Sequence, residues 1–109
     1  MDKLLQMLSL ARRAGKLALG FDAVGEAAQS GRAALILLSE QAAERTRRNI
    51  LRIAEKRAPV LPVPYSPDAL SAVLGKAVAA LAVTDPNFAD GIRKLLPRND
   101  PNQGASPNL

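Results

Sequence analysis

The chain has 109 residues, of which 48% are hydrophobic, so its length and composition predict one globular domain with a single core. Its 15 Lys and Arg residues outnumber its 10 Asp and Glu residues, and the net charge of +5 favours an anionic partner such as nucleic acid, although solubility alone also explains such a charge. The absence of Cys and His excludes disulfides, Cys-based zinc sites, Cys nucleophiles and His general bases.

The sequence shows no membrane-targeting feature. No apolar run approaches the roughly 20 residues that a membrane span needs. The N-terminal stretch begins with Asp2, lacks a small-residue cleavage site and is amphipathic, unlike a signal peptide. We therefore expect a cytoplasmic protein without a membrane partner.

The first third of the chain predicts two helices separated by a strand. Apolar side chains at helical spacing predict a helix over residues 3–14, with Gly15 as a left-handed C-terminal cap. The short apolar stretch 17–20 is typical of a strand. Asp22 is the expected N-cap of a helix over 23–30, because its carboxylate can accept hydrogen bonds from first-turn N–H groups.

The middle of the chain predicts a buried strand, a long helix and an edge strand. The continuous apolar run 34–38 is typical of a strand buried on both faces. A helix is expected over 42–57, with Ala43, Ile50, Ile53 and Ala54 toward the core. Prolines bracket residues 60–63, which predicts a short strand near a sheet edge or end, because proline removes a ladder donor.

The last third predicts helix, strand and helix. Ser66 or Asp68 begins a helix through Leu74, and residues 79–83 form a fourth strand. Asp85 caps a final helix that has Pro86 at its first position and ends near residue 96. Residues 97–109 lack apolar periodicity and are expected to form a disordered tail, so the domain spans 1–96.

The element order predicts an α/β fold. Helices and strands alternate, with connections too long for hairpins, which is typical of a three-layer α/β/α sandwich around a four-stranded, largely parallel or mixed sheet. The order of the strands does not follow from the sequence.

The chemistry of the side chains does not favour an enzyme. The acidic residues form no spaced pair typical of general acid–base catalysis, and no phosphate-cradling glycine motif occurs. Gly20, Phe21 and Asp22 form a strand-to-helix turn that could present backbone N–H groups to an anion, although turn geometry alone is the better explanation. We expect no cofactor, no metal and no small-molecule substrate.

The basic residues carry the functional argument. Ten of the fifteen are Arg, the side chain suited to bidentate phosphate contacts, although a charge run is usually a solvated face. With only three aromatic residues, a stacking platform for single strands is not expected. The candidate RNA contacts on the predicted third helix are Arg45, Arg47 and Arg48, and those outside it are Lys16, Arg32 and Lys76.

Four ordered segments support a family resemblance. The segments LARRAGKL, ALILLSEQA, LGKA and AVTDPNFADGI resemble bacterial members of the kink-turn RNA-binding ribosomal protein family, of the YlxQ type, in the superfamily of archaeal ribosomal and box C/D core proteins. The resemblance covers roughly residues 3–95. It implies a three-layer α/β/α sandwich around a four-stranded mixed sheet and a non-catalytic role in binding ribosomal or other structured RNA.

The resemblance breaks off where the family reads kink-turns. Kink-turn readers carry the pattern basic–Gly–x–Asn–Glu–x–x–Lys, of which this chain keeps only Gly20; Asp22, Ala23 and Glu26 replace the Asn, Glu and Lys. The connection between LGKAV and ALAVTD is also shorter than in those proteins. We therefore expect the protein to contact rRNA or another structured RNA through the backbone and the shape of the RNA, and to associate with the ribosome. We also expect the protein to be a monomer. The alternative is a protein-interaction adaptor that kept the fold and lost RNA binding.

Overall fold

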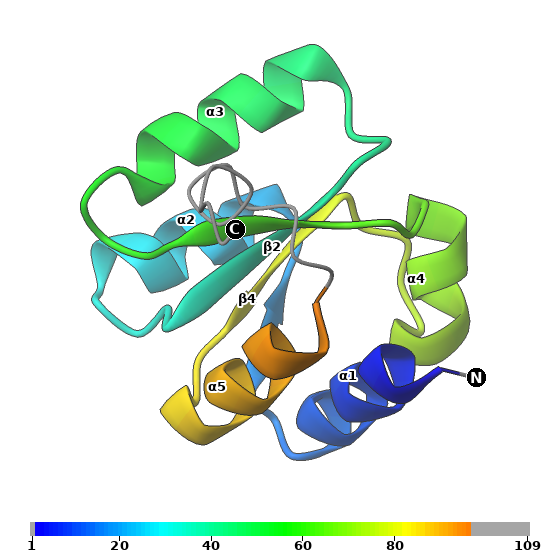
Figure 1. Ribbon diagram of the computed structural model, residues 1–109. Helices are drawn as coiled ribbons and strands as arrows, with labels where there is room; N and C mark the ends of the chain where they lie inside the picture. The colour runs from blue at the N-terminus through cyan, green and yellow to red at the C-terminus, as the bar shows by residue number, and fades with distance from the viewer. Residues whose placement is uncertain (1, 97–109) are drawn as a thin grey trace, which may run out of the picture.

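The computed structural model describes residues 2–96, over which helices and strands alternate (Figure 1). The predicted tail, 97–109, lies outside the described residues. The helices are α1 (Lys3–Arg13), α2 (Phe21–Gln29), α3 (Glu44–Ala54), α4 (Pro67–Leu74) and α5 (Pro86–Leu95). The strands are β1 (Leu17–Leu19), β2 (Leu35–Ser39), β3 (Val60–Val63) and β4 (Ala80–Val83).

The strands form one mixed sheet in the order β1-β4-β2-β3. β4 runs antiparallel to both β1 and β2, whereas β2 and β3 are parallel. The proline-bracketed β3 is an edge strand, as predicted, and its exposed Pro62 lies opposite Leu38. An edge position suits a residue that has no N–H to donate to the ladder.

The side chains of β2 divide the core into two layers. Leu35 and Leu37 pack with α1, α4 and α5 on one face, and Ile36 and Leu38 pack with α2 and α3 on the other. The two groups of helices lie on opposite sides of the sheet in Figure 1. Because successive strand residues point to opposite faces, a continuous apolar run buries both of them. The predicted three-layer α/β/α sandwich is therefore confirmed.

The sheet has two chemically different ends. The antiparallel pairing of β4 places its first residue at the end where β1, β2 and β3 finish. We call this the carboxyl end of the sheet and the opposite one the amino end. Four connections meet at the carboxyl end: Gly20, residues 40–43, residues 64–66 and residues 75–79.

Two helix starts differ from the sequence prediction. α2 begins at Phe21 with Gly20 as its N-cap, so Asp22 lies inside the first turn and is not the cap. α3 is shorter than predicted, and Ala43 is exposed at its N-cap position instead of being in the core. Ile50 and Ala54 are buried as expected, and Ile53 is half-buried.

Candidate nucleic-acid interface

The turn between β1 and α2 leaves backbone donors without a side-chain acceptor. Gly20 has φ 95° and ψ 166°, and its N–H donates to the carbonyl of Ala80 at 3.0 Å. The Gly20 carbonyl accepts from the N–H of Val24, and no side chain caps the helix. Asp22 is exposed in the first turn, where its charge complements the helix dipole without capping it. The first-turn N–H groups of α2 therefore remain available at the carboxyl end of the sheet.

The connection from α4 to β4 lies against this turn. A Cβ built on Gly20 would lie 3.9 Å from Lys76 Nζ and 3.9 Å from Val78 Cγ1. The structure thus brings Lys76 together with the predicted Gly20, Phe21 and Asp22, although more than 50 residues separate them in sequence. Lys76 and Phe21 are exposed, so a cation and an aromatic ring lie beside the uncapped helix start.

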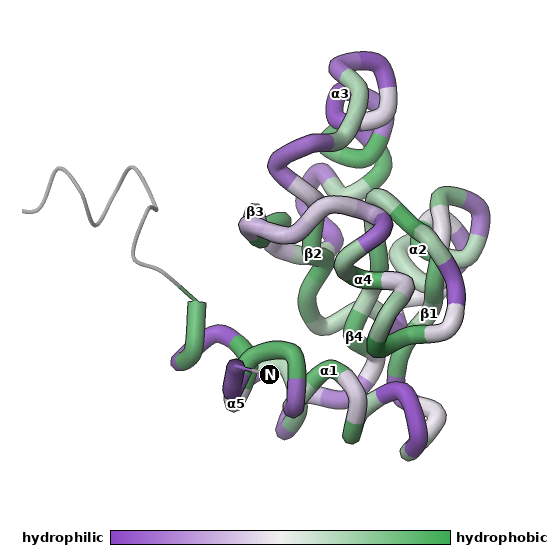
Figure 2. The backbone as a smooth tube through the Cα atoms, turned by 90° about the vertical axis from the view of Figure 1, so that its right-hand side faces the viewer, coloured by the Kyte–Doolittle hydropathy of each residue, from purple (hydrophilic) through white to green (hydrophobic). Residues whose placement is uncertain are grey.

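The arginine-rich helix α3 begins at the same carboxyl end of the sheet. Arg45, Arg47 and Arg48 are all exposed in the first half of the helix. Glu44 Oε1 pairs with Arg47 Nε at 3.4 Å and its Oε2 with Arg48 Nε at 3.9 Å, whereas Arg45 makes no ion pair within residues 2–96. In Figure 2, α3 projects from the molecule and is hydrophilic over much of its length. These exposed pairs are weak in water and leave the arginines able to exchange partners.

A buried serine joins two of the connections at this end. Ser39, at the end of β2, is 1% exposed. Its hydroxyl donates to the carbonyl of Tyr65 at 2.6 Å and accepts from the N–H of Gln41 at 3.0 Å. The residues 40–43 and 64–66 are thereby held together. Sequence reasoning missed Ser39, for which the one signal is a polar residue that ends a buried apolar strand.

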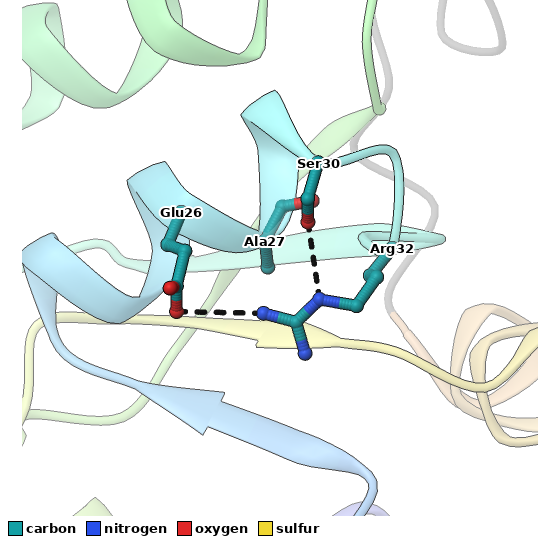
Figure 3. A network of polar contacts seen from close by, with 4 residues as sticks. All are labelled: Glu26, Ala27, Ser30 and Arg32. Atoms are coloured by element: carbon teal, nitrogen blue, oxygen red, sulfur yellow. Dashed lines mark hydrogen bonds and ion pairs between the residues drawn. The ribbon is translucent and has the colours of Figure 1, made fainter.

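Two predicted contacts, Lys16 and Arg32, have their backbones at the amino end. The carbonyl of Lys16 accepts from the N–H of Thr84, just beyond β4. Arg32 precedes β2, and its guanidinium donates to Ser30 Oγ at 3.0 Å and to Glu26 Oε1 at 3.5 Å (Figure 3). The structure therefore does not join these two cations to the Gly20 turn, and it gives Glu26 an exposed ion-pair partner.

The start of α1 is linked to the connection between β3 and α4. Tyr65 donates its hydroxyl to Asp2 Oδ2 at 2.7 Å, and Asp2 Oδ1 accepts from the N–H of Leu5 at 2.8 Å. The bond from Leu5 and then the bond from Tyr65 lower the pKa of Asp2. Burial and the hydrogen bond to Asp2 raise the pKa of Tyr65. A surface pocket of about 280 Å³ beside this pair is lined by Asp2, Lys3, Leu4, Pro64, Tyr65 and Leu95.

Within residues 2–96 no three acidic side chains come together in a way that could hold a metal ion. None of the helices in that range has the length and apolar character needed to cross a membrane.

Comparison with known proteins identifies the family. Residues 2–92 match the model of the ribosomal protein L7Ae/L30e/S12e/Gadd45 family. The chain belongs to this family. It is 34% identical over 95 residues to the RNA-binding protein YlxQ of Bacillus subtilis (strain 168), which covers 83% of this chain and 91% of that protein. A solved structure of a protein with unknown function from Bacillus halodurans is similar with a TM-score of 0.80 and 30% identity, over 87% of this chain and 97% of that one.

Family membership confirms the resemblance and gives the candidate residues a context. The resemblance implies base readers at the positions of Asp22 and Ala23 on α2, and a contact to the RNA backbone at the position of Glu26. Asp22 is exposed, Ala23 is half-buried, and Glu26 is exposed and paired with Arg32. Neither the half-buried alanine nor the carboxylates can supply the amide and ammonium donors of the kink-turn pattern.

Proposed function

We propose that this protein binds structured RNA, without catalysis, through the carboxyl end of its sheet. The observation that carries the proposal is that the strand order brings Lys76 to the Gly20 turn at the end where the arginine-rich α3 begins. The partner class is supported by the L7Ae/L30e/S12e/Gadd45 family and by the name of the YlxQ relative.

The helix directions support an anionic partner at this end. α2, α3 and α4 each follow a strand that finishes at the carboxyl end, so all three helices begin there. A helix N-terminus carries a partial positive charge and free N–H groups. Arg45, Arg47 and Arg48 add side chains that can bind phosphate oxygens in a bidentate manner.

The replaced reader positions favour binding through the RNA backbone. With Asp22 and Ala23 on α2, base-edge contacts of the kink-turn type lack an amide donor and an acceptor, and Glu26 places a negative charge where a phosphate would approach. Affinity then comes from the phosphate backbone and from RNA shape, and it falls as salt rises. The proposal includes rRNA or another structured RNA as ligand, association with the ribosome, and a monomeric protein in the cytoplasm.

The test is a titration of the full chain with a kink-turn RNA, a duplex RNA and total rRNA, each at two salt concentrations. We expect binding to all three RNAs, and we expect this binding to weaken as the salt concentration rises. Charge reversal of Arg45, Arg47 and Arg48 to Glu should weaken binding at least about tenfold and lower the salt slope by about three, one for each phosphate contact.

The matched control reverses the charges of Arg13, Lys16 and Arg32. These three residues have the same total charge as the three arginines of α3, and their backbones lie at the amino end of the sheet. Reversing these three should leave most of the affinity intact. Equal losses in the two triple variants would show that net charge, and not the carboxyl end, governs binding. If the wild type shows no salt-sensitive binding to any of the three RNAs, RNA binding is rejected. The alternative, a protein-interaction adaptor, is then favoured, and the replaced kink-turn positions on α2 also agree with it.

A further inference from the structure

Phe21 is the exposed aromatic side chain of the described chain. It is 42% exposed at the first position of α2. The other two aromatic residues are held by the fold: Tyr65 is half-buried and donates to Asp2, and Phe88 is half-buried against the core. The part of the Phe21 ring that the fold leaves uncovered can therefore contact a ligand at the start of α2.

The surroundings of Phe21 indicate which part of an RNA it fits. Lys76 Nζ lies close to the adjoining Gly20, so the spot attracts a polyanion. Asp22, the next residue, adds a negative charge to the same first turn of α2, so an uncharged group fits this spot better than a phosphate does. The flat, uncharged face of a base satisfies both conditions, because it brings no charge to Asp22 while its backbone remains near cations.

We propose that Phe21 stacks on one unpaired base of the bound RNA, an inference that rests on the proposed RNA-binding function. Every base has a π-face, so such stacking tolerates any sequence and adds affinity without base-edge donors. A single ring accommodates one base, which agrees with the small number of aromatic residues and with the absence of a single-strand platform. The ligand is then a helical RNA that carries an unpaired nucleotide.

The test compares two RNAs that differ only in one unpaired nucleotide, a bulged stem and the same stem fully paired. The wild type should bind the bulged stem more tightly. Phe21→Leu keeps an apolar side chain but removes the π-face, so it should weaken binding of the bulged stem about tenfold and leave the paired stem unchanged. Phe21→Trp should retain or strengthen binding of the bulged stem.

The tryptophan variant also reports the contact directly. The chain contains no Trp, so Phe21→Trp introduces a single fluorophore whose emission should be quenched by the bulged stem and not by the paired stem. Leu51 on α3 is 43% exposed and supplies the matched control, because Leu51→Ala removes a similarly exposed apolar side chain elsewhere. Leu51→Ala should leave the difference between the two RNAs unchanged.

The outcomes separate the inference from the function on which it rests. If the wild type binds both stems and Phe21→Leu binds the bulged stem as tightly as the wild type, the stacking role is rejected while RNA binding stands. Equal quenching of Phe21→Trp by both stems also rejects it. If the wild type binds neither stem, RNA binding itself is rejected and the stacking role with it.

Discussion

Gly20 holds the β1–α2 turn in a conformation that side chains rarely allow. Its φ of 95° with ψ of 166° lies in a region populated essentially by glycine alone. Space is not the constraint, because a Cβ there would make only ordinary contacts with Lys76 and Val78. Gly20 is therefore required by the backbone geometry, which in turn sets where α2 begins and where Phe21 points.

Replacement of this glycine by alanine should be costly, whereas replacement of a helical glycine should not. Gly20→Ala is expected to lower the free energy of unfolding by about 1–3 kcal/mol. Gly25 lies inside α2, where a Cβ would meet Ile53 Cδ1 at 3.7 Å, so Gly25→Ala should be neutral or stabilise by up to about 1 kcal/mol. Urea unfolding of both variants measures the difference. Equal effects of the two substitutions would contradict the assigned turn geometry.

At the scale of elements, the sequence predicted the helix ends that are set by a capping residue close by in the chain. Gly15 has φ 73°, and its N–H donates to the Arg12 carbonyl at 3.1 Å, as expected of a left-handed cap. Asp85 caps α5 through the N–H groups of Asn87 and Phe88, with Pro86 at the first position.

Contacts between segments far apart in the chain determine the features that the sequence did not predict. Arg12, in the last turn of α1, donates to the carbonyl of Leu74 at the end of α4. α3 begins late because residues 40–43 form a connection held by Ser39. It stops early because Glu55 leaves the helical conformation, with ψ of 122°. The strand order depends on pairing between residues far apart in the chain. Sequence periodicity therefore predicted the layers but not that Lys76 meets Gly20.

The hydrogen bond between Tyr65 and Asp2, which links α1 to the β3–α4 connection, should make the stability of the protein depend on pH. The folded-state pKa of Asp2 lies below its ordinary value of 3.8, so the stability that the carboxylate contributes is present above about that pH and is lost as pH falls through the folded-state pKa. We expect Asp2→Ala to lower the Tm at neutral pH, and the gap from the wild type to shrink below about pH 3.8.

Thermal unfolding monitored by circular dichroism between pH 2 and pH 7 measures this gap. Tyr65→Phe removes one of the two side-chain hydrogen bonds described above for the Asp2 carboxylate and leaves the bond from Leu5, so it should reproduce part of the effect. A gap between the wild type and Asp2→Ala that stays constant over this range would show that the carboxylate has no part in it.

At the scale of the whole molecule, the account depends on which end of the sheet faces the RNA. The carboxyl end combines Lys76, Phe21, the uncapped start of α2 and the first arginines of α3. The amino end has the backbones of Lys16 and Arg32, the second of which is paired with Glu26. Both ends are basic in sequence, so net charge alone does not distinguish them, whereas the topology does.

The most direct test is to map the RNA contact by NMR on the 15N-labelled protein of 11.5 kDa, titrated with a structured RNA. We predict that the amide shift changes concentrate at residues 20–22, 40–48 and 75–79. Changes concentrated instead around Lys16, Arg32 and Thr84 would place the RNA at the amino end and contradict the central claim.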